Sequence, residues 1–319
     1  MLQVKIYYVS ILIIMKILFV CSGNSINGIS PIIKNQGLSL ENEGIDITYF
    51  TIIGKGLIGY LKNVKRLKDF INKNKYDIIH AHYSMSAFVA SLAGSKPLVV
   101  SLMGSDVKSD KFYKIFIYLF NKYSWSKTIV KSEDMKMSLG IKGIQVIPNG
   151  VDLVKFKPLD QIECKKKLKW NCNKKQILFA SNPNRYEKNY PLAKNSFALL
   201  DDINYELKVL ENIANDLMPL YFNAADLVIL TSLWEGSPNV IKEAMACNRP
   251  ILSTNVGDVS NLLSNVEGCN IIEVNTQDIA DKIKNNIGKF SISDGRKKVK
   301  LLKIDSRNVA VKIIKLYEI

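Results

Sequence analysis

Short apolar runs alternate with amphipathic helical patterns along most of this 319-residue sequence, and this rhythm limits the possible folds more than any other feature. Short apolar runs between helices are typical of parallel strands that are buried on both faces by crossover helices. The expected strands lie at residues 17–21, 45–49, 77–80, 98–103, 128–131, 144–147, 177–180, 206–210, 226–231, 251–253 and 271–273. The sequence therefore predicts an α/β protein with doubly wound, Rossmann-like parallel sheets.

The rhythm is interrupted once, where Pro148, Gly150 and Pro158 fall close together. Proline and glycine are the strongest local breaks in regular structure, and each flanking part is long enough for a domain. Helical patterns are expected up to about Glu43 and over Tyr60–Asn72. We predict four parts: an N-terminal extension over residues 1–14, a first domain over 15–150, a second domain over 151–305, and a C-terminal helix over 306–319.

The apolar run at the N-terminus is neither a membrane span nor a signal peptide by its pattern. Lys16 interrupts it, no small-residue cleavage site follows, and a span needs roughly 20 apolar residues. Residues 15–20 already have the pattern of a first strand. We interpret residues 1–14 as an upstream extension, consistent with a start codon assigned too early.

The chain is strongly basic, with 44 Lys and Arg against 29 Asp and Glu, a net charge of +15. Such a charge favours anionic partners: nucleotide sugars, phospholipid headgroups, lipid-linked phosphates or nucleic acid. Nucleic acid is the weakest of these because no compact basic run is interleaved with aromatic residues. The five cysteines form no C-x-x-C pair and the chain has two histidines, which predicts reduced thiols, a cytoplasmic location and no zinc site.

The segment Ser232–Ala246 carries the strongest functional signal. It joins a predicted strand to a predicted helix, with Ser237 as the expected N-cap and Pro238 as the first helical residue. A helix N-terminus can hold a phosphate group. Glu235 and Glu243 frame this turn, and two carboxylates there are better suited to sugar and ribose hydroxyls than to phosphate alone.

Five ordered segments of the sequence together resemble retaining glycosyltransferases of family 4. They are Glu235–Glu243 (the Glu-x7-Glu signature), Ile147–Asp152 followed by Phe156, Arg185–Lys188, Tyr221–Asp226 and Asn255–Asp258. The resemblance covers nearly the whole chain and is densest between residues 147 and 263. It implies the GT-B fold, in which two Rossmann-like domains face each other across a cleft and the C-terminal helix crosses back to the first domain.

The resemblance also implies where a nucleotide-sugar donor binds. Glu243 would bind the ribose, Arg185 and Lys188 the diphosphate, and Glu235 the hydroxyls of the sugar. We expect both basic side chains at the surface of the cleft. The full set of expected donor-binding residues is Gly28, Arg185, Lys188, Glu235, Gly236, Ser237, Asn239, Val240 and Glu243.

Three residues are expected on the acceptor side: His82, Met103 and Asp106. His82 follows a predicted strand. Met103 stands where the family usually has a histidine that contacts the transferred sugar, and a thioether cannot donate a hydrogen bond. This departure leaves Asp106 as the polar group expected to face the acceptor.

We therefore predict a retaining, metal-independent glycosyltransferase with Glu235, Arg185, Lys188 and Asp106 as catalytic residues. The donor would be UDP- or GDP-linked, with no other cofactor and no metal, since no Asp-x-Asp triad occurs in the sequence. The acceptor would be a saccharide or lipid-linked saccharide of cell-envelope or exopolysaccharide synthesis, reached from the inner face of an anionic membrane. Two alternatives stay open: a non-catalytic sugar-nucleotide-binding subunit, which Met103 favours, and a basic nucleic-acid scaffold.

Overall fold

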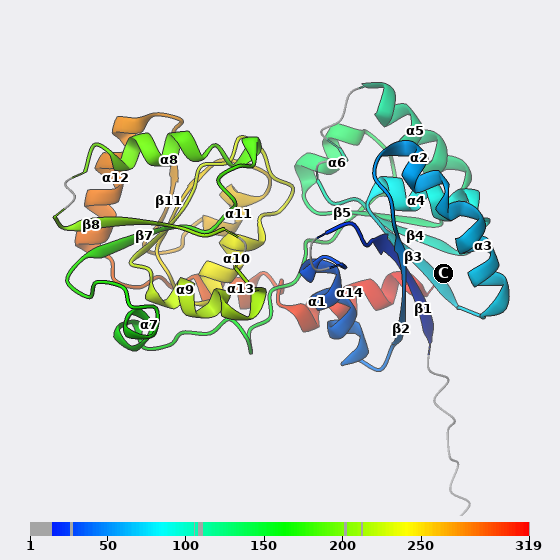
Figure 1. The fold of residues 1–319 in the computed structure, drawn as a ribbon, viewed down its shortest axis with the longest axis horizontal. Coiled ribbons are helices and arrows are strands. Elements are labelled where there is room, and N and C mark those ends of the chain that lie inside the picture. The colour runs from blue at the N-terminus through cyan, green and yellow to red at the C-terminus, as the bar shows by residue number, and fades with distance from the viewer. Residues whose placement is uncertain are drawn as a thin grey trace, which may run out of the picture.

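The computed structural model describes residues 15–25, 28–104, 106–107, 111–200, 203–211 and 213–318. The expected N-terminal extension, residues 1–14, lies outside the described residues. Two α/β domains lie side by side, each built on one parallel sheet (Figure 1). This arrangement confirms the predicted fold class.

The first domain has a six-stranded sheet in the order β2-β1-β3-β4-β5-β6, and every pairing in it is parallel. Its strands are β1 (Lys16–Ser22), β2 (Asp46–Ile52), β3 (Ile78–His82), β4 (Leu98–Ser101), β5 (Lys127–Val130) and β6 (Gln145–Val146). Its helices are α1 (Pro31–Glu41), α2 (Gly56–Leu61), α3 (Asn63–Lys73), α4 (Ser84–Leu92), α5 (Lys111–Tyr123) and α6 (Glu133–Leu139).

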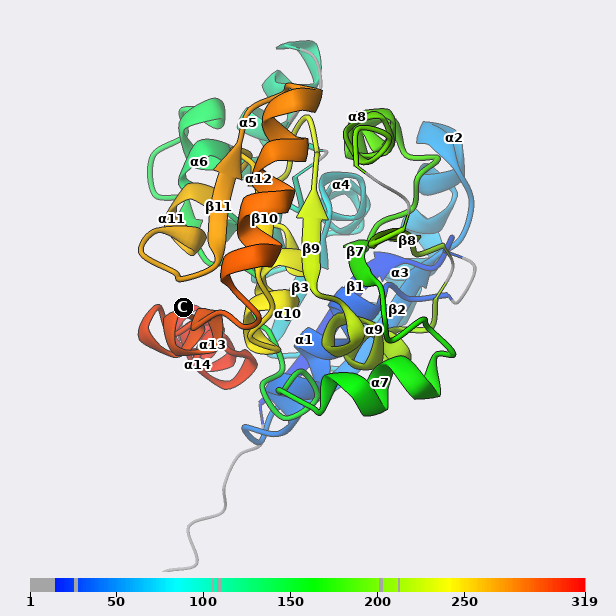
Figure 2. The ribbon, with the colours of Figure 1, turned by 90° about the vertical axis from the view of Figure 1, so that its left-hand side faces the viewer.

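The second domain has a five-stranded parallel sheet in the order β11-β10-β9-β7-β8. Its strands are β7 (Lys175–Phe179), β8 (Tyr205–Val209), β9 (Leu227–Leu230), β10 (Ile251–Thr254) and β11 (Cys269–Ile272). Its helices are α7 (Gln161–Lys167), η1 (Tyr186–Lys188), α8 (Tyr190–Phe197), η2 (Asn215–Leu217), α9 (Met218–Ala224), α10 (Asn239–Ala246), α11 (Val259–Leu263), α12 (Thr276–Lys289) and α13 (Gly295–Leu301). Figure 2 views the molecule from the side of this domain, with its strands in front.

Each expected strand overlaps one observed strand, and the predicted helical pattern over Tyr60–Asn72 is confirmed with one interruption. The pattern over Tyr60–Asn72 is divided between α2 and α3, which meet at Lys62. The side chain of Asn63 bonds the backbone at this interruption: its Nδ2 donates to the carbonyl oxygens of Ile53, at 2.9 Å, and Gly59, at 2.8 Å. An amide that bonds nearby backbone carbonyls competes with helix continuation.

The last helix, α14 (Ser306–Tyr317), packs against the sheet of the first domain beside α1 (Figure 1). The two chain crossings between the domains run side by side, because Val151 N donates to Ile304 O and Ser306 N donates to Val151 O. Gly150 is required at this crossing, since a Cβ there would lie 2.7 Å from Ser306 Cα. Two adjacent segments of chain, hydrogen-bonded to each other, thus join the domains.

No helix among the described residues is both long and apolar enough to cross a bilayer.

Candidate active site

The two domains touch where loops follow the carboxyl ends of their strands. Gly104 follows β4 and Gly236 follows β9, and a Cβ on Gly236 would lie 3.4 Å from Gly104 Cα and 3.0 Å from the sulfur of Met135. Gly104 has φ +124, a conformation that side chains rarely adopt. Ligands of open α/β sheets bind outside the carboxyl ends of the strands, so this contact marks the candidate site.

Lys188 and Glu235 form a close ion pair at this edge. Lys188 Nζ lies 2.5 Å from Glu235 Oε1, and Ser232 Oγ donates to the same oxygen at 2.8 Å. The Lys188 residue is 9% exposed, so the expectation that it lies at the cleft surface is wrong. Its position is fixed because Thr231 Oγ1 donates to its carbonyl oxygen at 3.0 Å. The sequence predicted that these two residues share one site, but it did not predict that they pair directly.

Arg185 differs from Lys188 in both exposure and partner. Its side chain is 59% exposed and its guanidinium pairs with Glu187. Next to it, the rings of Tyr186 and Trp234 lie 6.0 Å apart and tilted, with Trp234 directly before Glu235. The structure therefore places one basic group inside the site and the other at its rim.

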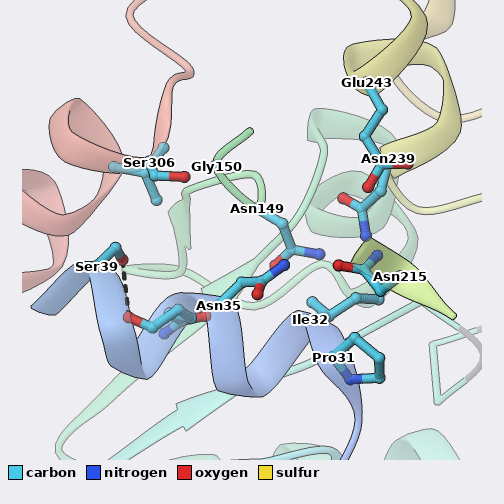
Figure 3. Close-up of a pocket in the computed structure, with 12 residues that line it drawn as sticks. Pro31, Ile32, Asn35, Ser39, Asn149, Gly150, Asn215, Asn239, Glu243 and Ser306 are labelled. Carbon is cyan, nitrogen blue, oxygen red and sulfur yellow. Dashed lines mark hydrogen bonds between the residues drawn. The ribbon is translucent and has the colours of Figure 1, made fainter. Parts of the chain in front are cut away.

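Glu243 lies in a separate small cavity between the domains. The cavity, of about 40 Å³, lies between α10 and α1 and is lined by polar side chains from both (Figure 3). Buried oxygen atoms of Asn239 and Asn149, Oδ1 in each, have no hydrogen-bond partner among the described residues. Burial raises the pKa of Glu243 to about 7, against the opposing effect of the Lys242 and Lys155 charges. Unmet acceptors beside a carboxyl group suit a ligand that brings hydroxyl donors.

Ser237 is not the N-cap that the sequence predicted. Helix α10 begins at Asn239 with Pro238 as its N-cap, and Ser237 Oγ instead donates to Asp258 Oδ2 at 2.6 Å. Lys242 Nζ donates to Ser237 Oγ at 3.1 Å and to Asn149 O, across the domain boundary, at 2.8 Å. Burial lowers the pKa of Lys242 to about 8.

Lys242 was not among the site residues predicted from the sequence, although a signal was present. Lys242 follows Val240 and Ile241 within the apolar part of the helix, where a charged residue needs a partner. Val240 itself is half-buried on α10. The contact of Lys242 with Asn149 shows that this lysine ties helix α10 to the chain crossing between the domains.

Asp106 holds a loop together. It is 1% exposed, and its carboxylate accepts hydrogen bonds from the backbone N–H groups of Met103 at 3.0 Å, Gly104 at 2.9 Å and Ser84 at 3.2 Å. Burial raises the pKa of Asp106, while these backbone donors oppose the rise. This geometry suits a carboxylate that shapes the Met103–Gly104 loop, and a contact between Asp106 and the acceptor stays a prediction.

His82 lies in the core and not on the acceptor side, where the sequence predicted it. It is fully buried in the core of the first domain, with its ring 4.4 Å from the rings of Phe19 and His80, measured between centroids. Neither of its ring nitrogens has a partner among the described residues, and burial holds its pKa well below the usual value. His82 is therefore a core residue and not an acceptor contact.

Gly28 lies in the loop after β1, at the same edge of the sheet. Its φ of +74 requires glycine or a strained residue, and no heavy atom lies within 4 Å of where its Cβ would be. The loop is therefore open at this point. A contact between Gly28 and a diphosphate stays a prediction.

No group of three or more His, Cys, Asp or Glu side chains that could hold a metal ion occurs within the described parts of the chain.

Two family models match the chain, one in each domain. Residues 29–132 match the family described as glycosyl transferase 4-like, and residues 174–288 match the glycosyl transferases group 1. The second match contains the Lys188–Glu235 pair and Glu243.

Two curated relatives have similar sequences. A galactosyltransferase of Escherichia coli, named UDP-Gal:alpha-D-GlcNAc-diphosphoundecaprenol alpha-1,3-galactosyltransferase, is 28% identical over 70% of this chain and 69% of its own length. TuaC of Bacillus subtilis, a teichuronic acid biosynthesis glycosyltransferase, is 26% identical over 68% of this chain and 63% of its own length. The chain thus matches less than two thirds of TuaC.

Solved structures share the fold at low sequence identity. Sucrose-phosphate synthase from Thermosynechococcus elongatus has a TM-score of 0.79 at 15% identity, over 95% of this chain and 98% of that one. A glycosyltransferase from Rickettsia africae has 0.74 at 17%, over 96% and 98%. Anabaena HepE in complex with UDP has 0.73 at 18%, over 94% and 99%. The paired Rossmann-like domains, the two family matches and these relatives agree: the chain belongs to the group 1 glycosyl transferases of family 4 and is a glycosyltransferase with the GT-B fold.

Proposed function

We propose that this glycosyltransferase is retaining and metal-independent, and that it moves a sugar from a UDP- or GDP-linked donor to a lipid-linked saccharide of the cell envelope. The observation that carries the proposal is the Lys188–Glu235 pair, 2.5 Å apart, at the loop contact between the domains. A buried ammonium group beside a carboxylate provides one charge for a diphosphate and one for a sugar. No further cofactor is required by this chemistry.

In the proposed complex the donor diphosphate lies against Lys188, with Arg185 closing over it from the rim. Glu235 then leaves Lys188 and accepts hydrogen bonds from the sugar hydroxyls. An ammonium that already has a carboxylate partner is held in place for the incoming phosphate, so little reorganisation is needed. The exposed Arg185 can change partner from Glu187 at low cost, because surface ion pairs contribute little.

The ribose of the donor is assigned to the cavity with Glu243 and Asn239. The carboxylate would accept hydrogen bonds from the ribose hydroxyls, and such charge-assisted bonds are roughly twice as strong as neutral ones. The unpartnered oxygen of Asn239 offers a further acceptor. This assignment separates the nucleoside from the sugar by the length of the turn between Glu235 and Glu243.

The proposed reaction breaks the bond between the anomeric carbon and the diphosphate oxygen, whose electron pair leaves with the diphosphate. The acceptor hydroxyl then bonds to the same face of the sugar ring, and its proton passes to an oxygen of the departing diphosphate. The transition state is oxocarbenium-like and needs no enzyme nucleophile. The protein's main contribution is to stabilise the charge that develops on the leaving group.

A lipid-linked acceptor is supported by the relatives and by charge. The name of the Escherichia coli relative specifies a diphosphoundecaprenol-linked acceptor, and TuaC is named for teichuronic acid biosynthesis. The net charge of +15 favours binding to anionic phosphates and to the inner face of an anionic membrane. Peripheral membrane contact is part of this proposal.

A thermal-shift screen of UDP- and GDP-sugars tests the donor, because a ligand that binds only the folded state raises its melting temperature. NMR of the transfer product tests the stereochemistry, and we expect the anomeric configuration of the donor to be kept. Product of inverted configuration, or a screen in which no nucleotide sugar stabilises the protein, would overturn the proposal.

A further inference from the structure

A cavity of about 880 Å³ opens on the first domain among helices α2, α4 and α5, which lie together in Figure 1. Its wall is mainly apolar and aromatic, with Leu57 and Leu61 from α2, Leu92 from α4 and Phe116 from α5. None of the expected donor-binding residues lines it. We call this cavity the apolar groove. Its volume is within the range typical of small-molecule sites.

Helix α2 leaves its apolar side chains in solvent. It has no buried residue, and Leu57 is 62% exposed and Ile58 72% exposed. Its place is set by the backbone instead, because Gly54 and Gly59 approach so closely that a Cβ on Gly59 would lie 2.7 Å from the Gly54 carbonyl carbon. Exposed apolar side chains that adjoin a groove are typical of a binding surface.

The inner end of the groove reaches the candidate active site. Asp106, which lines it, holds the Met103–Gly104 loop that touches Gly236 of the second domain. Asn24 lines the same end, and its side chain exchanges hydrogen bonds with the backbone of Gly54 at 2.8 and 2.9 Å. A molecule lying in the groove therefore presents one end to the site of sugar transfer.

The segment that forms α2 and α3 is strongly basic. Residues 55–75 contain seven basic residues and one acidic residue, Asp69. The basic residues are all exposed and are Lys55, Lys62, Lys65, Arg66, Lys68, Lys73 and Lys75. Lys55 itself lines the groove and follows Gly54, whose backbone bonds the side chain of Asn24. The surface thus combines the apolar groove with the ammonium group of Lys55, which can bind a phosphate.

We propose that the apolar groove holds the hydrocarbon chain of the lipid-linked acceptor, with the lipid's diphosphate against Lys55 and its sugar at the Met103–Gly104 loop. The inference rests on the proposed function, because it assigns a binding site to the acceptor of that reaction. Each part of the lipid thus has a counterpart here: the apolar wall for the chain, Lys55 for the diphosphate and the Met103–Gly104 loop for the sugar.

The composition of the wall favours a hydrocarbon chain over other occupants. A free oligosaccharide needs many hydrogen-bonding partners, whereas most of the groove lining is apolar. A hydrocarbon chain needs none, and each buried methylene group contributes about 0.8 kcal/mol. The lysines then account for the anionic part of the same molecule.

Titration calorimetry with farnesyl diphosphate tests the proposal, with inorganic diphosphate as the head-group control. Excess UDP is present throughout, so that neither probe occupies the donor site. We expect farnesyl diphosphate to bind at least about tenfold more tightly than inorganic diphosphate. The double variant Leu57→Gln/Leu92→Gln should lose about tenfold in farnesyl diphosphate affinity, since both side chains line the groove.

Ile58→Gln is the matched control, because Ile58 lies on the same helix and is more exposed, but does not line the groove. We expect its affinity to equal that of the unmodified protein. Equal weakening by Ile58→Gln and by the double variant would mean that the helices dock on a bilayer surface without taking a chain into the groove, and would overturn the proposal.

The two proposals fail differently. If UDP binds but farnesyl diphosphate binds no better than inorganic diphosphate, the groove assignment is wrong and the donor assignment stands. If neither UDP nor GDP binds, the proposed function fails. Lys55→Gln adds a second test, since it should weaken the binding of farnesyl diphosphate but leave farnesol binding unchanged. Equal loss for both probes would contradict the place of the diphosphate.

Discussion

The two domains share one architecture but differ at the edge where they meet. In the second domain the carboxyl ends of the strands carry paired charges, Lys188 with Glu235 and Lys242 near Asp258. In the first domain the corresponding edge opens into the apolar groove, and its buried histidine, His82, has no hydrogen-bond partner among the described residues. The edge of the second domain is built from directional polar contacts, whereas the edge of the first domain is mainly an apolar cavity wall.

This difference teaches how one scaffold can serve two kinds of ligand. Charged groups in a poorly solvated site are useful only if neighbours fix their positions, so the donor edge depends on many specific bonds. The apolar groove does not need neighbours that fix the positions of charged groups, and it tolerates variation in the ligand that occupies it. The following changes should therefore affect activity most on the donor side.

Lys188→Ala should have the largest effect. It removes the buried ammonium that is expected to stabilise the leaving diphosphate, and it leaves Glu235 without its partner. We expect kcat to fall at least about a hundredfold, as when a preorganised electrostatic contact is lost. Steady-state transfer assays measure this, and the thermal midpoint should also fall, because an unpaired buried carboxylate costs about 1–3 kcal/mol.

Lys194→Ala on α8 is the control, because that side chain is exposed. It should leave kcat and the thermal midpoint unchanged. Turnover close to normal in a folded Lys188→Ala variant would mean that the donor edge is not organised around this lysine.

Gly257→Ala should come second. Gly257 has φ +59, and a Cβ there would overlap the carbonyl oxygen of Gly236, so the Glu235–Gly236 turn must move. We expect kcat/KM to fall about tenfold, because small displacements of a catalytic turn are costly. Transfer assays beside a thermal melt separate this from lost stability.

The matched variant is Gly140→Ala in the first domain. Gly140 has φ +64 but no atom within 4 Å of its Cβ position, so it carries the same backbone strain without the overlap. Backbone strain alone should cost each variant about 1 kcal/mol of stability. An equal loss of activity in both would show that strain alone, and not the position of the turn, is responsible.

Glu243→Gln should weaken UDP binding severalfold, since it loses the charge-assisted bonds to ribose. The pKa of Glu243 is raised to about 7, so UDP affinity of the unmodified protein should fall as pH is lowered through 7, and the variant should lose this dependence. Calorimetric titration at several pH values measures both effects.

The same group has an opposite effect on the unliganded protein. Its folded-state pKa lies above the unfolded value, so its contribution to stability is present at low pH and is lost as pH rises through about 7. Glu243→Gln should therefore be more stable than the unmodified protein at pH 8, by about 1–2 kcal/mol.

Glu235→Gln should instead lower turnover and leave UDP affinity nearly unchanged. The reverse pattern would mean that the two carboxylates have exchanged roles.

Arg185→Ala should have the smallest effect, a decrease of a few fold in kcat. Its side chain is 59% exposed and already paired with Glu187, so solvent screens its charge more than that of Lys188. The effect should shrink further as salt is added to the transfer assay. A loss as large as that of Lys188→Ala would show that the rim closes tightly over the donor.

The sequence predicted the strands well because strand formation in a parallel sheet depends on local apolar runs. Every expected run overlaps an observed strand, and the chain crossing at Gly150 lies within the expected boundary region. It failed where a side chain binds a distant or competing partner. Asn63 bonds the carbonyls of Ile53 and Gly59 where one expected helical pattern divides into α2 and α3, and Ser237 bonds Asp258 instead of capping α10.

Amino-acid order alone thus determined the two Rossmann-like domains and the motif that holds Glu235 and Glu243, since both depend on local periodicity and spacing. Tertiary structure decided which of these groups meet. It paired Lys188 with Glu235, drew Asp106 into the Met103–Gly104 loop, buried His82 and left the apolar groove open. These outcomes depend on burial and on contacts between residues far apart in the chain. A local sequence pattern does not specify which distant residues come into contact.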